Sequence, residues 1–105
     1  DCATSIIHSK TANPGKILKN ATVVISCVGK ERVFTKSMIN RGTVLISVGL
    51  WRDNEGKLHG DYDKEDMKDI ASFYTPTPGG VGPVNVACLM QNLVDACIMS
   101  IDVKK

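Results

Sequence analysis

Residues 75–83 read Thr-Pro-Thr-Pro-Gly-Gly-Val-Gly-Pro, a stretch that contains three prolines and three glycines. Prolines fix the backbone angle φ, whereas glycines allow backbone angles and close approaches that a Cβ would forbid. Because Pro83 can occupy the first turn of a following helix, the stretch also brings free backbone N–H groups to its own end. This composition predicts a loop of fixed shape that holds a ligand against its backbone, and a rigid connector is the alternative.

A long amphipathic helix is predicted directly behind this loop, from about Val84 to Met99. Its apolar side chains recur at spacings of three and four residues, which places them on one face of a helix. We expect this face to pack in the core of the protein. Its members are Val86, Leu89, Met90, Leu93, Val94 and Cys97.

Strand-like and helix-like segments alternate in the chain before the loop. Nearly continuous apolar runs, as at 22–28, are typical of parallel strands covered on both faces, and we expect this run to form a central strand. The polar, turn-rich residues 51–60 predict a surface excursion. Strands are predicted at 3–7, 22–28, 43–48 and 72–74, and short helices at 14–19, 35–39 and, behind the N-cap Asp63, 63–70. This alternation predicts an α/β fold with a parallel sheet.

The composition is that of a folded domain or part of one, with 105 residues, 43% hydrophobic and 23% charged. The net charge is +2 and the basic residues are dispersed, so charge gives no reason to expect a nucleic-acid partner. Uninterrupted apolar runs are far shorter than a membrane span, and the N-terminus lacks the layout of a signal peptide. We therefore expect no membrane partner and an intracellular protein, in the cytoplasm or in an organelle such as the mitochondrion.

The four cysteines, Cys2, Cys27, Cys88 and Cys97, show no C-x-x-C spacing and lie in apolar contexts. Such cysteines are typical of reduced thiols in a core. We expect neither a disulfide nor a metal site.

Polar or glycine-rich turns follow each predicted strand, at 8–11, 29–30, 49–50 and 75–83. The carboxyl ends of parallel strands meet at one edge of a sheet, where ligands bind. The first turn, His8-Ser9-Lys10-Thr11, offers two hydroxyls, a cation and an imidazole, which suit a phosphate, although a solvated turn is the alternative. Since the sequence contains neither G-x-G-x-x-G nor G-x-x-x-x-G-K-[ST], the pyrophosphate loop of a nucleotide site is absent from this chain.

Several of these motifs together resemble a known enzyme family over essentially the whole chain. They are His8-Ser9-Lys10-Thr11, Ile25–Lys30, Ser47-Val48-Gly49, Gly60-Asp61 and residues 75–83. In order and spacing they are similar to the carboxyl-terminal part of bifunctional methylenetetrahydrofolate dehydrogenase/cyclohydrolase. The resemblance implies that residues 1–105 form a Rossmann-like NAD(P)-binding domain lacking its first β-α unit. It also implies an enzyme, NADP-dependent or in some members NAD-dependent, that oxidises 5,10-methylenetetrahydrofolate to the methenyl form and hydrolyses that to 10-formyltetrahydrofolate.

The resemblance also assigns residue roles. It implies that Ser9, helped by His8 and Lys10, meets the 2′-phosphate of NADP, and that the backbone of Leu50 holds the nicotinamide carboxamide. The further coenzyme-binding residues that it implies are Gly29, Val48, Gly49 and Asn85. The folate side of the cleft is implied to be lined by Pro78, Gly79, Gly80, Val81 and Gly82.

The chain departs from the family pattern at Ser47, where an aspartate is usual, at Thr77, where a valine is usual, and at Val84-Asn85, where Met-Thr is usual. The family's catalytic lysine and tyrosine belong to an amino-terminal domain, so we expect no catalytic residue here. The chain starts almost inside a predicted strand, and we expect it to be a portion of a longer enzyme.

The resemblance implies three partners: a folate substrate, an amino-terminal catalytic domain or chain, and a second copy in a homodimer. A non-catalytic α/β binding or assembly module is the alternative function.

Overall fold

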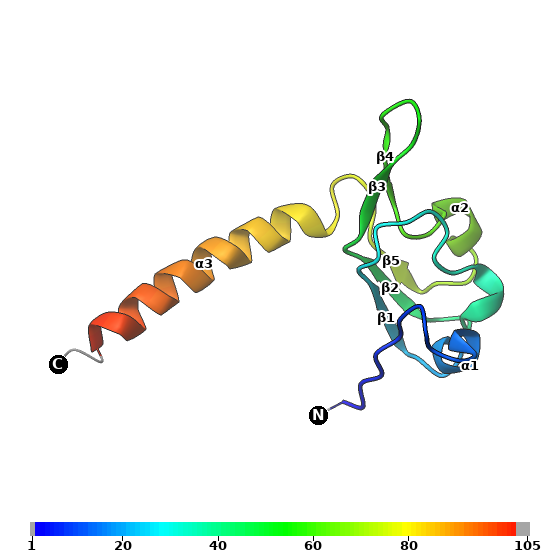
Figure 1. Cartoon of the computed structure of the whole chain (residues 1–105), viewed down its shortest axis with the longest axis horizontal. Helices are drawn as coiled ribbons and strands as arrows, with labels where there is room; N and C mark the ends of the chain where they lie inside the picture. The colour runs from blue at the N-terminus through cyan, green and yellow to red at the C-terminus, as the bar shows by residue number, and fades with distance from the viewer. Residues whose placement is uncertain (1, 103–105) are drawn as a thin grey trace.

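The computed structural model describes residues 2–102 and contains a parallel sheet with short helices over its buried face (Figure 1). Within these residues the helices are α1 (Pro14–Leu18), the 3₁₀ turn η1 (Lys36–Met38), α2 (Lys64–Met67) and α3 (Val81–Asp102). The strands are β1 (Val23–Ser26), β2 (Val44–Ser47), β3 (Leu50–Arg52), β4 (Leu58–Gly60) and β5 (Phe73–Tyr74). The predicted α/β class is confirmed.

Strands β1, β2 and β5 form the parallel sheet in the order β1-β2-β5, with Val23 opposite Val44 and Val44 opposite Phe73. The prediction that residues 22–28 form a central strand is wrong for the described residues, since β2 is central and β1 lies at an edge. The prediction that this strand is covered on both faces is also wrong. Val24 is buried on one face, but Ile25 on the other is 62% exposed, because no element within residues 2–102 covers that face.

Residues 3–7, predicted to form a strand, are irregular in the structure. A strand needs a neighbour to pair with its backbone N–H and C=O groups, and within residues 2–102 this segment pairs with no strand. Ile7 packs partly against the core, whereas Ile6 is exposed. The segment therefore has a strand-like composition without a strand's hydrogen bonds.

The core lies between the inner face of the sheet and the segments α1, η1 and α2. Leu45 at its centre is fully buried, and the rings of Phe34 and Tyr62 are 5.6 Å apart. The N-cap predicted for α2 is confirmed, because the Asp63 carboxylate accepts a 3.0 Å hydrogen bond from the backbone N–H of Glu65. The core consists of Leu18, Val24, Phe34, Ile39, Leu45, Tyr62 and Met67.

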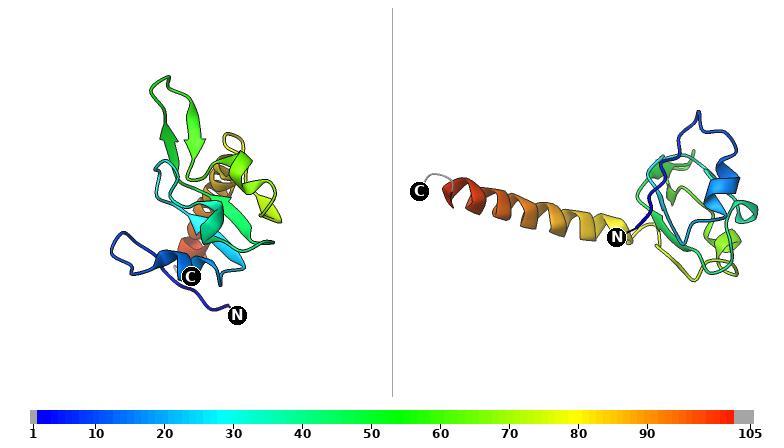
Figure 2. Two further views of the ribbon diagram at one scale, coloured as in Figure 1. Left: turned by 90° about the vertical axis from the view of Figure 1, so that its right-hand side faces the viewer. Right: turned by 90° about the horizontal axis from the view of Figure 1, so that it is seen from below.

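The predicted surface excursion is an antiparallel hairpin of β3 and β4, which stands out from the sheet in Figure 2. Asp53 closes its tip, since one carboxylate oxygen accepts from the backbone N–H groups of Glu55 at 3.0 Å and Lys57 at 2.9 Å. The other oxygen lies 2.6 Å from Nε2 of His59, whose ring stacks on Trp51. The hairpin is therefore held by its own polar side chains.

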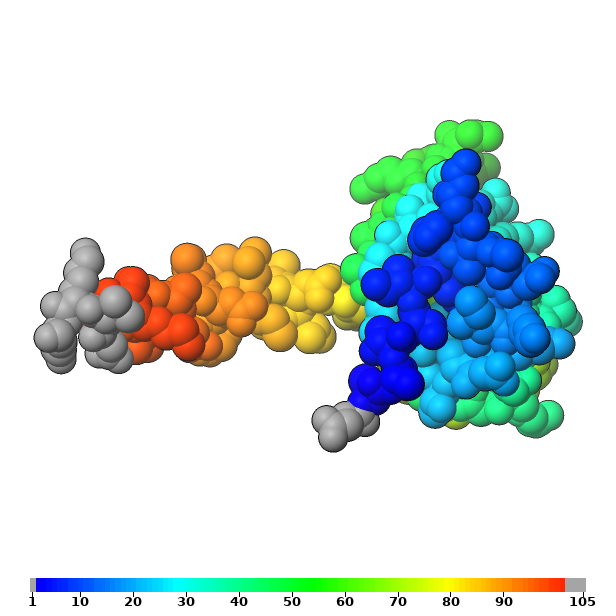
Figure 3. Space-filling model, turned by 60° about the horizontal axis from the view of Figure 1, so that its bottom comes forward, coloured from blue at the N-terminus to red at the C-terminus, as the bar shows by residue number. Residues whose placement is uncertain are grey.

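Helix α3 starts at the expected loop but projects away from the rest of the chain (Figures 1 and 3). The prediction that its apolar face packs in the core is wrong within the described residues: Leu93, for example, is 64% exposed. The cysteines are likewise free and exposed rather than buried. The physical reason is that the periodic pattern indicates an apolar face without supplying a surface to cover it.

By length and composition alone, Val81–Ile101 would suffice to cross a bilayer, with a mean hydropathy of 1.5 and none of its length buried. The expectation from short apolar runs overlooked this, because isolated polar residues such as Asn85 and Gln91 interrupt the runs without lowering the mean much. A helix in the core of a larger fold has the same length and composition.

Candidate functional site: a cavity at the carboxyl ends of the strands

A cavity of about 210 Å³ lies where β2 and β5 end and α3 begins. Its wall includes all five residues predicted to face folate, 78–82, together with Val48, Leu50 and Asn85 from the predicted coenzyme site. The lining is completed by Ser47, Leu58, Pro76 and Thr77. The structure thus brings together the predicted residues that follow β2 with those of the Gly/Pro loop and the first turns of α3.

The backbone of the Gly/Pro loop has features that depend on glycine. The peptide bond between Thr77 and Pro78 is cis, and Gly79 has a φ of +91°, which an L side chain rarely adopts. A Cβ on Gly80 would collide with the carbonyl oxygen of Pro76. At least two of the glycines are therefore required by the backbone of the loop itself.

Three side chains or backbone groups outside the loop anchor it. The ammonium of Lys64 in α2 donates to the carbonyl of Thr77 at 2.5 Å, and the N–H of Ser47 donates to Oγ1 of Thr75 at 2.9 Å. The hydroxyl of Tyr62 donates to the carbonyl of Thr75 at 3.0 Å, and burial raises the pKa of this phenol. Because it stays protonated, Tyr62 remains a donor to the loop at neutral pH.

Gly29 and Gly49 do not line the cavity, but Gly49 lies between Val48 and Leu50, which do. A Cβ on Gly29 would come within 3.1 Å of the carbonyl oxygen of Leu50, and one on Gly49 would collide with the backbone nitrogen of Gly29. The turns after β1 and β2 are therefore packed backbone against backbone. Their position determines where Val48 and Leu50 stand.

Asp61 is a residue of this edge that sequence reasoning noted only as part of a motif. Its side chain is fully buried, and one carboxylate oxygen accepts from the N–H groups of Gly29 at 2.7 Å and Lys30 at 3.0 Å. The other accepts from the Ser26 hydroxyl at 2.5 Å and the Val28 N–H at 3.0 Å. The Ser47 hydroxyl accepts from the Asp61 N–H at 3.0 Å. The sequence offered a signal for Asp61, because an acidic residue that directly follows a glycine at the end of a strand needs a polar partner if it is buried.

The turn 8–11 is not among the residues that line the cavity. Within residues 2–102 its hydrogen bonds are internal, from the His8 N–H to Oγ1 of Thr11 at 3.0 Å and from the Lys10 N–H to Nδ1 of His8 at 3.1 Å. His8, Ser9 and Lys10 are exposed, and the expectation that this turn follows a strand is wrong. Its role in binding the coenzyme stays a prediction.

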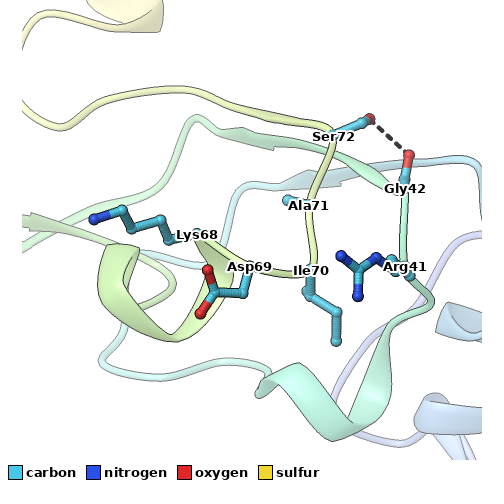
Figure 4. A pocket seen from close by; sticks show the side chains of 7 residues that line it. All are labelled: Arg41, Gly42, Lys68, Asp69, Ile70, Ala71 and Ser72. Atoms are coloured by element: carbon cyan, nitrogen blue, oxygen red, sulfur yellow. Dashed lines mark hydrogen bonds between the residues drawn. The ribbon is translucent and has the colours of Figure 1, made fainter.

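A second hollow, of about 580 Å³, lies at the opposite, amino ends of β2 and β5 (Figure 4). Among its lining residues the Ser72 hydroxyl donates to the carbonyl of Gly42 at 2.6 Å, and Lys68 points away from this pair. Ligands of parallel α/β sheets bind at the carboxyl ends of the strands. The smaller cavity beside the Gly/Pro loop is therefore the candidate site.

A family model described as the NAD(P)-binding domain of tetrahydrofolate dehydrogenase/cyclohydrolase matches residues 1–101. The chain belongs to this family. Among its relatives, the bifunctional protein FolD of Lactococcus lactis subsp. lactis is 44% identical over 96 residues, which are 91% of this chain and 34% of that protein. The FolD of Lachnoclostridium phytofermentans is 47% identical over 90 residues, 86% of this chain and 32% of that protein. The chain thus spans about a third of the length of the relatives it matches.

Solved structures of family members have the same fold. The bifunctional 5,10-methylenetetrahydrofolate dehydrogenase/cyclohydrolase of Thermoplasma acidophilum superposes with a TM-score of 0.86 at 33% identity, over 93% of this chain and 35% of that one. The dehydrogenase-cyclohydrolase of Trypanosoma brucei, solved with NADP and an inhibitor, gives a TM-score of 0.73 at 30% identity, over 83% and 31%. These likenesses confirm the Rossmann-like fold and the coenzyme-domain portion predicted from the sequence.

Proposed function

We propose that this chain is the coenzyme-binding part of an NADP-dependent methylenetetrahydrofolate dehydrogenase/methenyltetrahydrofolate cyclohydrolase. It contributes one wall of a cleft in which 5,10-methylenetetrahydrofolate is oxidised and the methenyl product is hydrolysed to 10-formyltetrahydrofolate. The observation that carries this proposal is the cavity, because the predicted coenzyme residues Val48, Leu50 and Asn85 share it with the predicted folate residues 78–82. A dehydrogenase needs its two ligands side by side, and here their predicted contacts are adjacent.

The residues of the cavity fit one end of a dinucleotide. Val48 and Leu50 are 36% and 49% exposed and present an apolar wall for a flat ring, and Asn85 offers an amide that both donates and accepts. Bound NADP would supply the hydride acceptor. The exposed cation and hydroxyl of Lys10 and Ser9 would hold its 2′-phosphate. At about 210 Å³ the cavity is smaller than a typical complete ligand site, so other parts of the protein complete it.

The acid–base groups for the chemistry are proposed to lie outside the described part of this chain. Among the residues 2–102 that line the cavity there is no histidine, lysine, aspartate or glutamate. His59 is paired with Asp53 in the hairpin, and the Lys64 ammonium is engaged by the Thr77 carbonyl. We therefore place the catalytic residues in an amino-terminal domain or chain, as in the family, and propose a cytoplasmic homodimer that serves one-carbon metabolism and purine biosynthesis.

The same amino-terminal part would cover the exposed apolar surfaces. These are the outer face of the sheet, with Val23, Ile25 and Phe73, and the apolar side of α3. Because the chain spans about a third of its relatives, most of the polypeptide that could cover them lies outside it.

An assay of the chain joined to the amino-terminal part of the Lactococcus lactis relative tests the proposal. We expect NADP-dependent oxidation of methylenetetrahydrofolate, and a soluble, folded hybrid that binds folate without turnover would contradict it. The variant Ser9→Ala tests the coenzyme preference, since loss of a charge-assisted hydrogen bond should weaken NADP binding about ten-fold or more. NAD binding should be nearly unchanged, as should both affinities in the exposed control Ser5→Ala. Equal losses for the two coenzymes would contradict the assignment of Ser9.

A further inference from the structure

The turn after β1 directs the successive backbone N–H groups of Val28, Gly29 and Lys30 at the two oxygens of one carboxylate. Converging backbone N–H groups of this kind form an anion-binding concavity, which in many proteins receives a phosphate. Here the anion is the chain's own Asp61 carboxylate, fully buried and distant in sequence. The concavity is therefore already filled from within the chain.

The remaining polar groups of Asp61 extend the connection to the other turns at this edge. Its N–H donates to Oγ of Ser47 at the end of β2, and its carbonyl accepts from the N–H of Val33 at 2.9 Å. Its neighbour Gly60 is equally confined, because a Cβ there would lie 2.8 Å from Oγ of Ser47 and 2.9 Å from Oγ1 of Thr77. The end of β4 thus touches the turns after β1 and β2 and the Gly/Pro loop.

The position of Gly49 connects the Asp61 carboxylate to the wall of the cavity. A Cβ on Gly49 would collide with the Asp61 carboxylate, so the turn between β2 and β3 rests directly on it. The residues on either side of Gly49 are Val48 and Leu50, which line the cavity. A displacement of the Asp61 side chain would therefore move the cavity wall.

We propose that Asp61 is a positioning residue that acts as a built-in anion. It fills the concavity of residues 28–30, excludes phosphate from the turn after β1, and fixes Val48 and Leu50 where the nicotinamide end of the coenzyme binds. The coenzyme part of this inference rests on the proposed function, whereas the anion site itself does not.

Replacement of the side chain by a soluble carboxylate tests the anion site directly. Asp61→Ala leaves the N–H groups facing an empty space, and formate has the same carboxylate group without the chain's Cβ. We expect formate, at matched ionic strength against chloride, to raise the unfolding temperature of Asp61→Ala with saturation. It should also restore the emission of Trp51, the single tryptophan, whose indole N–H donates to the Gly60 carbonyl at 2.8 Å. No response to formate would overturn the proposal.

Two variants separate this effect from general stabilisation. Asp61→Asn keeps the volume but turns an amide NH₂ toward backbone donors, so it should be impaired and should not respond to formate. Asp53→Ala removes a carboxylate that also accepts backbone N–H groups but stands at the hairpin tip, and it should not respond either. A formate response of equal size in all three variants would overturn the proposal.

Coenzyme titration of the same variants tests the positioning role. Asp61→Ala should bind NADP about ten-fold more weakly, with affinity recovered in formate, and unchanged affinity would overturn the role. Should Asp61→Ala fail to fold, Ser26→Ala decides, because it removes one hydrogen bond to the carboxylate without emptying the site. It should weaken NADP about three-fold with a smaller loss of stability than Asp61→Ala, and an unchanged affinity would again overturn the role. If the unaltered chain binds no NADP in any context, the proposed function fails, while the formate response still tests the anion site.

Discussion

The sheet region, residues 2–80, and helix α3 differ in how far their side chains are covered by the rest of the chain. In the sheet region the fully buried groups Leu45, Met67 and Asp61 all have their partners within the chain. In α3 the apolar residues from Val84 to Ile101 remain exposed, with Leu93 at 64%. The comparison teaches that one face of the parallel sheet is packed by the chain itself, whereas the apolar side of α3 and the outer face of the sheet have no covering surface within residues 2–102.

The largest expected effect concerns the isolated chain. It should self-associate and show no turnover of methylenetetrahydrofolate, because α3 and the outer sheet face are exposed and only one wall of the cleft is present. Light scattering should show association that falls in the double variant Leu89→Glu/Leu93→Glu and persists in the polar-site control Gln91→Glu. A stable monomer with turnover would contradict both the predicted association and the predicted lack of activity. Partition of the chain into liposomes would show that α3 binds lipid instead.

The next prediction compares one leucine from each region. Leu45→Ala should lower the free energy of unfolding by about 2–5 kcal/mol, because it opens a cavity in a fully packed core. Leu93→Ala, measured in chain diluted below the concentration at which it associates, should change it by no more than about 0.5 kcal/mol, since its side chain is largely exposed in the single chain. Urea unfolding followed by circular dichroism measures both. Equal losses would mean that α3 packs on the sheet region in solution.

Replacing two glycines near the junction of the two regions should change the stability by smaller amounts, and in opposite directions. Gly80→Ala should destabilise the chain by more than about 1 kcal/mol, because its Cβ would meet the Pro76 carbonyl oxygen. Gly82→Ala has open space around it within the first turn of α3 and should stabilise by about 0.4–1 kcal/mol. In the joined protein Gly82→Ala should nevertheless weaken folate binding if the loop is a ligand wall. Unchanged folate affinity would leave the loop a structural element only.

The features predicted correctly from sequence are those determined by near neighbours. Asp63 caps α2 because its carboxylate needs only the N–H two residues on, and the run 43–48 forms β2 because its apolar content demands burial. The features that were missed depend on distant partners. Asp61 reaches groups 31 to 35 residues away, and the burial of the α3 face depends on a surface beyond the described residues. Periodicity identifies an apolar face, but it carries no information on what covers that face.

The smallest expected effect concerns the β3–β4 hairpin, and its measurement tests whether the hairpin's own side chains hold its tip closed. Hydrogen bonds from His59 and from the N–H groups of Lys57 and Glu55 hold the pKa of Asp53 below its usual value of 3.8. A carboxyl whose pKa is lower in the folded state stabilises that state above its unfolded pKa, and this contribution is lost as the pH falls through the folded pKa. The hairpin should therefore stay closed at pH 5 and loosen only below pH 3.8. A carboxyl ¹³C titration should place the midpoint of Asp53 below that value in the unaltered chain and move it upward in His59→Ala, because the 2.6 Å hydrogen bond to the imidazole is then missing. The exposed control Lys36→Ala should leave it unmoved, and a midpoint that ignores His59 would show that the turn's backbone alone holds the tip.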